Sequence, residues 1–204
     1  MLKSVYRVDF EYDFKTHPAT LEKYKQDETQ TLQYLLTRVS LNIPNGTILM
    51  IPDKDLELKP WMVFWLESIK ASGYNRYIVL KMTHQITWRD RESKEHTAWC
   101  YFHGDGDSAL KETLKAAGAV YVEDSNTRFA VMSTTEFLRK DDYIEVGEGN
   151  LKEAYRVTGY DIHSTEGVEY VSFDPMYIKD KTPAPEKKPE NSSDDFYWLN
   201  GGEG

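Results

Sequence analysis

The first segment of the chain alternates strictly between apolar and charged residues. Apolar side chains occupy positions 6, 8, 10, 12 and 14, and charged ones occupy positions 7, 9, 11 and 13. Successive side chains of a strand point to opposite faces, so this alternation predicts a half-buried strand over residues 5–14.

The segment after His17 and Pro18 changes to a spacing of three and four residues. The positions that fit this spacing are Leu21, Tyr24, Glu28, Leu32, Leu35, Leu36 and Val39. Thr20 is available as an N-cap. The spacing predicts a helix from about residue 20 to residue 39.

Short apolar runs bounded by turn residues follow. Residues 47–51 come after the turn sequence Pro44-Asn45-Gly46, and every residue from Trp61 to Leu66 is apolar. A one-faced surface helix would not be apolar all round, so both runs predict buried strands.

The turn sequence 72–75 predicts a hairpin between the strand at 61–66 and a further strand at 76–82. A third strand is expected at 97–102, after the charged loop 89–95. These three adjacent strands would form a small meander or half of a barrel.

The second half of the chain predicts one short helix and several short strands. Residues 107–118 begin with an N-cap aspartate and end with glycine, which is typical of a helix. Strands are expected at 120–122, 129–132, 143–146, 155–160 and 168–173. Such regular short strands indicate a barrel or a sandwich.

The predicted fold class is therefore mainly β (α+β), with small β-barrel or sandwich modules and two short helices. We expect an N-terminal strand plus helix over residues 1–44 and a β-rich core over residues 45–180. A break near 104–119 would divide that core into two modules. Residues 181–204 are expected to be a linker that ends in an aromatic anchor.

That last segment is rich in proline and charge, a composition typical of an extended spacer. It ends in a dense apolar cluster, Phe196, Tyr197, Trp198 and Leu199, which we take as the candidate partner-binding residues. The four side chains either fold back onto their own domain or dock on a neighbouring subunit, as aromatic hot spots do.

Composition excludes several classes of function. The 204 residues carry a formal charge of −9, which argues against binding nucleic acid through an open basic face. The single cysteine, Cys100, excludes an internal disulfide and sits in an aromatic run typical of buried positions. No stretch has the roughly 20 apolar residues of a membrane span, and no signal-peptide core is present, so we expect a soluble protein in a reducing compartment.

The strongest candidate for catalytic chemistry is the loop His103-Gly104-Asp105-Gly106-Asp107. A histidine and two carboxylates on a flexible loop are suited to hold a hard cation, and His84 and His96 would be near enough in a meander to join them. Ordinary loop structure explains the same residues, with Asp107 as a helix N-cap. The spacing matches no known calcium or zinc motif, so we predict no metal, no cofactor and no catalytic residue.

Tyrosines interleaved with Arg76 at 74–77 are able to stack nucleic-acid bases, but tyrosines beside turns in a β protein are more often packing residues. The mixed-charge clusters 53–55 and 139–142 are expected to be solvated loops.

Several segments carry a resemblance to a known family. They are residues 76–84, 99–104, 127–132, 137–146, 155–161 and 167–171. In these the chain resembles the head-closure and head-to-tail connector proteins of tailed bacteriophages that infect Gram-positive hosts. The resemblance covers about residues 45–180 and leaves out the N-terminal segment and the aromatic tail.

The resemblance implies a non-enzymatic virion protein of the phage neck, assembled in the host cytoplasm. It would form a homo-oligomeric ring below the portal protein, close the DNA channel and contact tail or neck proteins, with packaged DNA passing through without specific binding and no membrane involved. Two alternatives remain open at this point: a metal-dependent hydrolase that uses His103, Asp105 and Asp107, and a peptide- or partner-binding β module.

Overall fold

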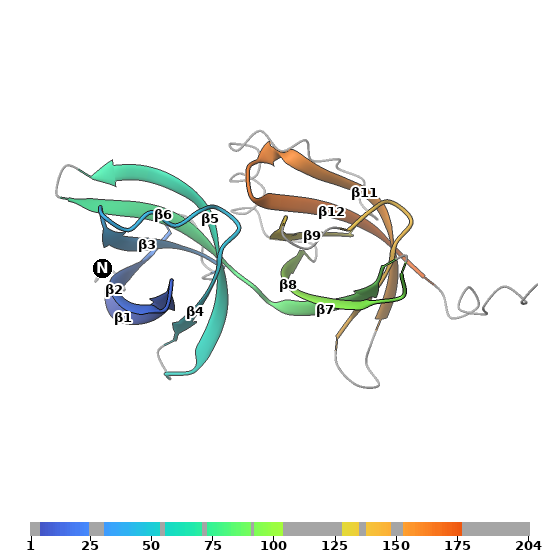
Figure 1. The fold of residues 1–204 in the computed structure, drawn as a ribbon, viewed down its shortest axis with the longest axis horizontal. Helices are drawn as coiled ribbons and strands as arrows, with labels where there is room; N and C mark the ends of the chain where they lie inside the picture. The colour runs from blue at the N-terminus through green and yellow to red at the C-terminus, as the bar shows by residue number, and fades with distance from the viewer. Residues whose placement is uncertain are drawn as a thin grey trace, which may run out of the picture.

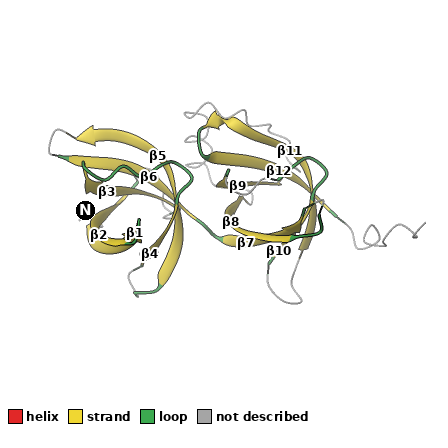
Figure 2. Ribbon diagram, in the orientation of Figure 1, coloured by secondary structure: helices red, strands yellow, loops and turns green. Residues whose placement is uncertain are grey.

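The computed structural model describes residues 5–24, 31–53, 56–70, 73–90, 92–103, 128–134, 138–147 and 153–176. Figures 1 and 2 show two groups of strands joined by a short connection, with only strands and loops in this part of the chain. The mainly β fold class is confirmed. The second predicted helix, at 107–118, and the strand at 120–122 lie outside the described residues.

Strands β1 to β6 form the N-terminal sheet, in the order β1-β2-β3-β6-β5-β4, with antiparallel neighbours. Their bounds are Val5–Tyr12, Lys15–Lys23, Leu32–Arg38, Ile48–Pro52, Leu58–Lys70 and Tyr74–Lys81. The edge strands β1 and β4 contact each other, so the sheet curls around a core to which all six strands contribute.

Strands β7 to β12 form the C-terminal barrel, which closes in the order β10-β11-β12-β9-β8-β7. Their bounds are His84–Arg89, Glu95–His103, Arg128–Ser133, Tyr143–Val146, Glu153–Thr165 and Val168–Pro175. Each strand has two antiparallel partners, and the inward side chains of all six strands form the barrel core. Closure leaves no free sheet edge.

The predicted helix at 20–39 is wrong. Within it, residues 20–23 belong to β2 and residues 32–38 to β3, and Thr20 lies in the interior of β2. Leu32 to Leu35 are buried on both faces of β3, and such a strand reads as a continuous apolar run. This run supplied the spacings of three and four that imitated a helix.

Most predicted strands are confirmed, including the alternating strand β1, the strand at 48–52 and the β5–β6 hairpin. The four later predicted strands that are described correspond to β9, β10, β11 and β12. The predicted meander of adjacent strands at 61–66, 76–82 and 97–102 is wrong. The last of these, β8, pairs with β7 and β9, because β7 begins at His84 and starts a separate sheet.

The two sheets share a hydrophobic cluster, which we call the shared cluster. Its buried members come from β3, β5 and β6 on one side, from β8, β9 and β12 on the other, and from the connection between the two sheets: Leu32, Tyr34, Met62, Phe64, Ile78, Leu80, Met82, Tyr101, Phe129, Val131 and Val168. The barrel thus covers part of the outer face of β3, β5 and β6, which explains why β5 and β6 are apolar on both faces.

The connection between the sheets is hydrogen-bonded to both. The Met82 amide donates to the Pro60 carbonyl on β5 (3.0 Å), and the Thr83 amide donates to the Cys100 carbonyl on β8 (3.0 Å). The change from one sheet to the other falls at these two residues. The domain boundaries expected at residues 44 and 181, and the break expected near 104–119, stay predictions.

A backbone contact between two turns reinforces this docking. Gly46, in the turn before β4, has φ +80°, and a Cβ built on it would lie 1.9 Å from the carbonyl oxygen of Gly167 in the β11–β12 turn. A Cβ on Gly167 (φ +81°) would lie 2.2 Å from the carbonyl oxygen of Asn45. Only glycine fits at both positions, since each needs positive φ and close backbone approach.

Candidate functional site

The aromatic cluster of the tail, Phe196 to Leu199, lies outside the described residues, as do Asp105 and Asp107 of the histidine-aspartate loop. His103 is placed only as the last residue of β8. The predicted partner-binding residues and the open metal hypothesis both stay predictions.

The structure does not bring the described histidines together. In the β7–β8 ladder, His84 lies opposite Cys100 and His96 lies opposite Trp88, four residues along the strand, or about 13 Å away. The His96 ring stacks on Trp88, and its Nε2 lies 2.8 Å from the Asp90 carboxylate, which lowers the Asp90 pKa. Among the described residues, no three metal-ligating side chains gather.

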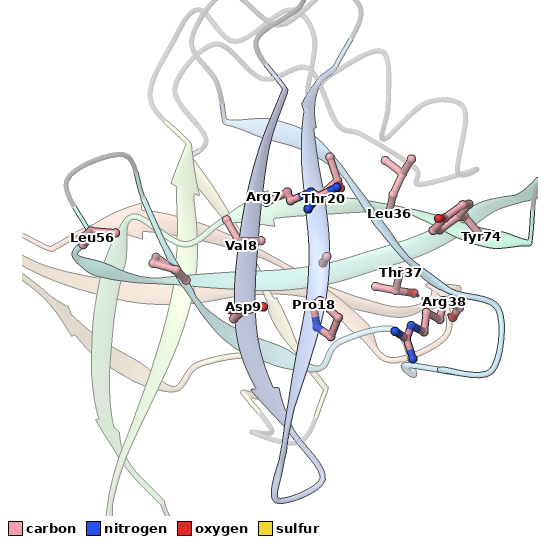
Figure 3. Close-up of a pocket in the computed structure, with 12 residues that line it drawn as sticks. Arg7, Val8, Asp9, Pro18, Thr20, Leu36, Thr37, Arg38, Leu56 and Tyr74 are labelled. Atoms are coloured by element: carbon pink, nitrogen blue, oxygen red, sulfur yellow. Dashed lines mark hydrogen bonds between the residues drawn. The ribbon is translucent and has the colours of Figure 1, made fainter.

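A surface groove of about 650 Å³ lies across the N-terminal sheet and is the candidate binding site (Figure 3). Residues of β1, β2, β3 and β6 line it, together with the end of β4 and the turn after it. The volume falls within the usual range for ligand sites.

The ladder explains why a groove opens here. The β1–β2 pairing continues to the hairpin, but the β2–β3 pairing stops at Thr20 opposite Leu36. The next residues toward the hairpin include Pro18, which lacks an amide donor and sits where β2 has left β3. Thr37 and Arg38 on β3 therefore have β6 as a partner but not β2, and a gap separates them from Pro18.

Strand alternation sorts the lining side chains by face. Val8, Ala19 and Thr37 are buried, whereas Arg7, Asp9 and Arg38 are exposed. Figure 3 shows Arg7 beside Thr20, with Arg38 and Tyr74 on the β3–β6 side of the groove.

Two guanidinium groups dominate the charge of the groove. The lining contains two arginines, Arg7 and Arg38, and one carboxylate, Asp9. The groove is therefore net positive, although the whole chain has a net charge of −9. Within the described part of the chain, neither arginine forms an ion pair. Arg76, in register with Leu36 on the next strand, is different because it pairs with Glu67 and lies 4.7 Å above the Tyr34 ring.

Exposed apolar side chains flank these charges. Tyr74 is 47% exposed and Leu56 is 83% exposed. Leu56 has φ +63°, held by a turn in which its amide donates to the Asp53 carbonyl (3.1 Å). Leucine rarely adopts a positive φ, and this exposed side chain adds apolar contact surface to the groove.

The groove offers both charged groups and apolar contact surface. Guanidinium groups bind carboxylates through charge-assisted hydrogen bonds, and an exposed tyrosine ring stacks on another aromatic ring. The arrangement is suited to binding an acidic and aromatic ligand.

Sequence reasoning missed this groove. A proline inside a strand marks a place where ladder pairing stops, so Pro18 was the available signal. In the Tyr74–Tyr77 segment, Tyr77 and Asn75 are buried and only Tyr74 is a surface aromatic. The packing interpretation is confirmed for Tyr77, and Cys100 is buried as expected, with its pKa raised to about 12 by desolvation.

A second feature that the sequence did not reveal is a carboxyl group in the barrel core. Glu169 on β12 is fully buried and lies opposite Met132, on the same face as Val171 and Phe173. Desolvation raises its pKa to about 8, partly offset by the Leu138 amide. The group is therefore mostly protonated at neutral pH.

Comparisons with known proteins add little to this picture. No family model matches the chain, and no curated protein matches it. Two solved structures are similar, both of MrkH. The first, from K. pneumonia in its apo state, shares 8% identity over 84% of this chain and 78% of that chain, with a TM-score of 0.28.

The second MrkH structure is described as a novel c-di-GMP-dependent transcription regulatory factor. It shares 9% identity over 85% of this chain and 79% of that chain, with a TM-score of 0.26. TM-scores this low carry no argument about fold or function. Among the described residues, no helix is long and apolar enough to cross a membrane.

Proposed function

We propose that the chain is a non-enzymatic structural protein of a tailed-phage neck, which forms a ring below the portal protein and joins head to tail. The observation that carries the proposal is where the family-like segments lie. Five of these segments overlap, in their described residues, the five strands β8 to β12 of one closed barrel: 99–104, 127–132, 137–146, 155–161 and 167–171. The remaining segment, 76–84, includes β6, which packs on that barrel through the shared cluster.

The docking of the two sheets supports a connector role. A connector has to hold its two contact surfaces at a fixed separation. Here the shared cluster, the hydrogen-bonded connection and the Gly46–Gly167 contact tie the two sheets together. Burial of apolar area stabilises the docked arrangement by about 25 cal/mol per Å². A hinge motion would expose part of the eleven buried side chains of the shared cluster to water, so it is disfavoured.

The surface of the barrel supplies candidates for subunit contacts. Trp99 on β8, Tyr143 on β10 and Tyr160 on β11 are 36%, 60% and 46% exposed. Exposed aromatic residues of this kind are enriched at interfaces. The net charge of −9 favours a channel wall that repels DNA and does not trap it.

The proposal is tested by removing the gene from a phage genome that encodes this chain. We expect heads that package DNA but carry no tails and lose their DNA, with both defects restored when the chain is supplied from a plasmid. Normal tailed, infectious particles without the chain would overturn the proposal.

The groove also favours a second candidate, a partner-binding β module of cellular origin. The same gene-removal experiment separates the two functions, because a cellular binding module has no effect on particle assembly.

A further inference from the structure

We propose that the groove lined by Arg7, Arg38 and Tyr74 binds the C-terminal segment 194–199 of a second copy of this chain. The inference deepens the proposed function and rests on it only for the closed ring. The binding itself needs no other virion protein.

The first argument is charge. The groove contains two arginines and one carboxylate, and neither arginine forms an ion pair with a described residue. Residues 190–199 of the tail carry three carboxylates, Glu190, Asp194 and Asp195, and no basic residue. Charge-assisted pairs between guanidinium and carboxylate are strong and directional, so this acidic stretch complements the groove.

The second argument is apolar chemistry. Asp195 is followed at once by Phe196, Tyr197, Trp198 and Leu199. Beside its arginines the groove exposes Leu56 and Tyr74, at 83% and 47%. Carboxylates followed by aromatic side chains therefore meet arginines flanked by apolar ones, and aromatic anchors at such sites contribute much of the binding energy.

The third argument is direction. Strand β12 ends at Pro175, on the side of the barrel away from the N-terminal sheet (Figure 1). The seventeen residues 177–193 span at most about 60 Å when extended. This length reaches an adjacent molecule, and a tail that leaves from the barrel end favours a neighbour's N-terminal sheet over its own.

Such a contact is heterologous, because the tail of one copy occupies the groove of the next. A heterologous contact that repeats with a closing rotation builds a ring. The long linker makes the docking tolerant of the exact spacing, and in the ring it raises the effective concentration of each tail at its groove.

The binding test uses the full-length protein and a fluorescently labelled peptide of residues 181–204. Fluorescence anisotropy should show saturable binding that weakens with added salt. In the double variant Arg7→Glu/Arg38→Glu, we expect the affinity to fall at least tenfold. The control, Arg156→Glu, changes an exposed arginine on β11 far from the groove and should leave it unchanged.

A peptide with Phe196, Tyr197, Trp198 and Leu199 all replaced by serine should also lose binding. Circular dichroism and thermal unfolding confirm that each protein variant is folded, as expected for exposed positions. No binding of the native peptide, or equal binding by the double variant, would overturn the inference.

A mixing experiment tests the second-copy requirement. One protein carries Arg7→Glu/Arg38→Glu with a native tail, and the other carries Asp194→Lys/Asp195→Lys with a native groove. Sedimentation velocity should show weaker self-association of each than of the wild type, and association when they are mixed, because one supplies the tail and the other the groove. Failure to associate on mixing would contradict docking between copies.

The two proposals fail separately. If peptide binding fails while the chain is still essential for joining heads to tails, only the groove assignment falls. If binding holds while particles assemble normally without the chain, the neck function falls and the self-association remains.

Discussion

The N-terminal sheet and the C-terminal barrel have the same number of strands but differ in whether their edge strands are hydrogen-bonded to a neighbour on both sides. The barrel closes, so every strand has two hydrogen-bonded neighbours. The N-terminal sheet keeps β1 and β4 as edges that contact each other without a ladder, and part of its β2–β3 pairing is missing. The less regular sheet is the one that carries the groove, so incomplete pairing opens the surface that we propose as a binding site, whereas the closed barrel leaves no strand edge.

A substitution in the shared cluster should break this division most severely. Phe64→Ala removes a fully buried ring that meets Tyr170 of the barrel edge to face at 6.4 Å. We expect a loss of about 3–5 kcal/mol in the free energy of unfolding. The matched control is Phe10→Ala, which removes a ring from the core of the N-terminal sheet alone.

Both variants should be destabilised by similar amounts in urea unfolding. Only Phe64→Ala should separate the unfolding of the two sheets into two transitions, because only it weakens their docking. Two transitions in the Phe10→Ala variant instead would place the coupling elsewhere.

The contact between the turns comes next in size. Gly46→Ala combines a positive φ, which costs about 1–2 kcal/mol, with an overlap against the Gly167 carbonyl, which costs about 1–3 kcal/mol. Gly73→Ala has nearly the same φ, +83°, but nothing within 4 Å of the added Cβ.

Gly73→Ala should therefore show the backbone cost alone, about 1–2 kcal/mol. The difference between the two variants in chemical unfolding measures the turn contact. Equal losses would show that Gly46 is not clamped against Gly167.

The buried carboxyl of the barrel predicts a pH dependence. The pKa of Glu169 rises from 4.5 to about 8 on folding, so the folded state binds more protons between these values and stability falls as pH rises through this window. The slope is up to about 1.4 kcal/mol per pH unit, or about 2–3 kcal/mol between pH 5 and pH 7.

Glu169→Gln should remove this part of the slope, whereas Glu145→Gln, at an exposed position on β10, should retain it. Urea unfolding at several pH values measures both. A Glu169→Gln variant with the wild-type slope would contradict a buried, protonated carboxyl.

Two buried tyrosines give the smallest contrast between the sheets. The Tyr77 hydroxyl accepts from the Ile43 amide (3.1 Å) and donates to the Leu41 carbonyl (3.0 Å), both backbone groups of the loop between β3 and β4. The Tyr155 hydroxyl in the barrel meets the side chains of Arg128 and Glu153, which solvent also reaches.

Tyr77→Phe should cost about 1–3 kcal/mol, because it leaves the buried Ile43 amide without its acceptor, whereas the Leu41 carbonyl keeps the Asn75 side-chain amide as a donor (2.9 Å). Tyr155→Phe should cost less than about 1 kcal/mol. Thermal or urea unfolding compares the two, and a larger loss for Tyr155→Phe would reverse this ranking.

The sequence predicted the strands of the barrel better than those of the N-terminal sheet, for a physical reason. Short barrel strands such as β10 alternate between buried and exposed positions, and this alternation can be recognised in the sequence alone. Strand β3 is buried on both faces because the barrel covers its outer side, and its continuous apolar run imitated a helix. A contact between sheets was therefore the missing information.

The groove was not predictable for a related reason. Arg7 and Arg38 are 31 positions apart in the chain, and only the strand order β1-β2-β3 brings them to one surface. The aromatic tail was predicted to be an anchor from its composition alone, whereas the groove that we propose as its binding site became visible only in the structure.

The most direct test of the connector function is quantitative mass spectrometry of purified phage particles, which gives the copy number of this chain relative to the major capsid protein. We predict a small, fixed number of copies per particle, as a ring at a single vertex requires. Absence from particles, or a copy number that varies between preparations, would contradict the neck assignment.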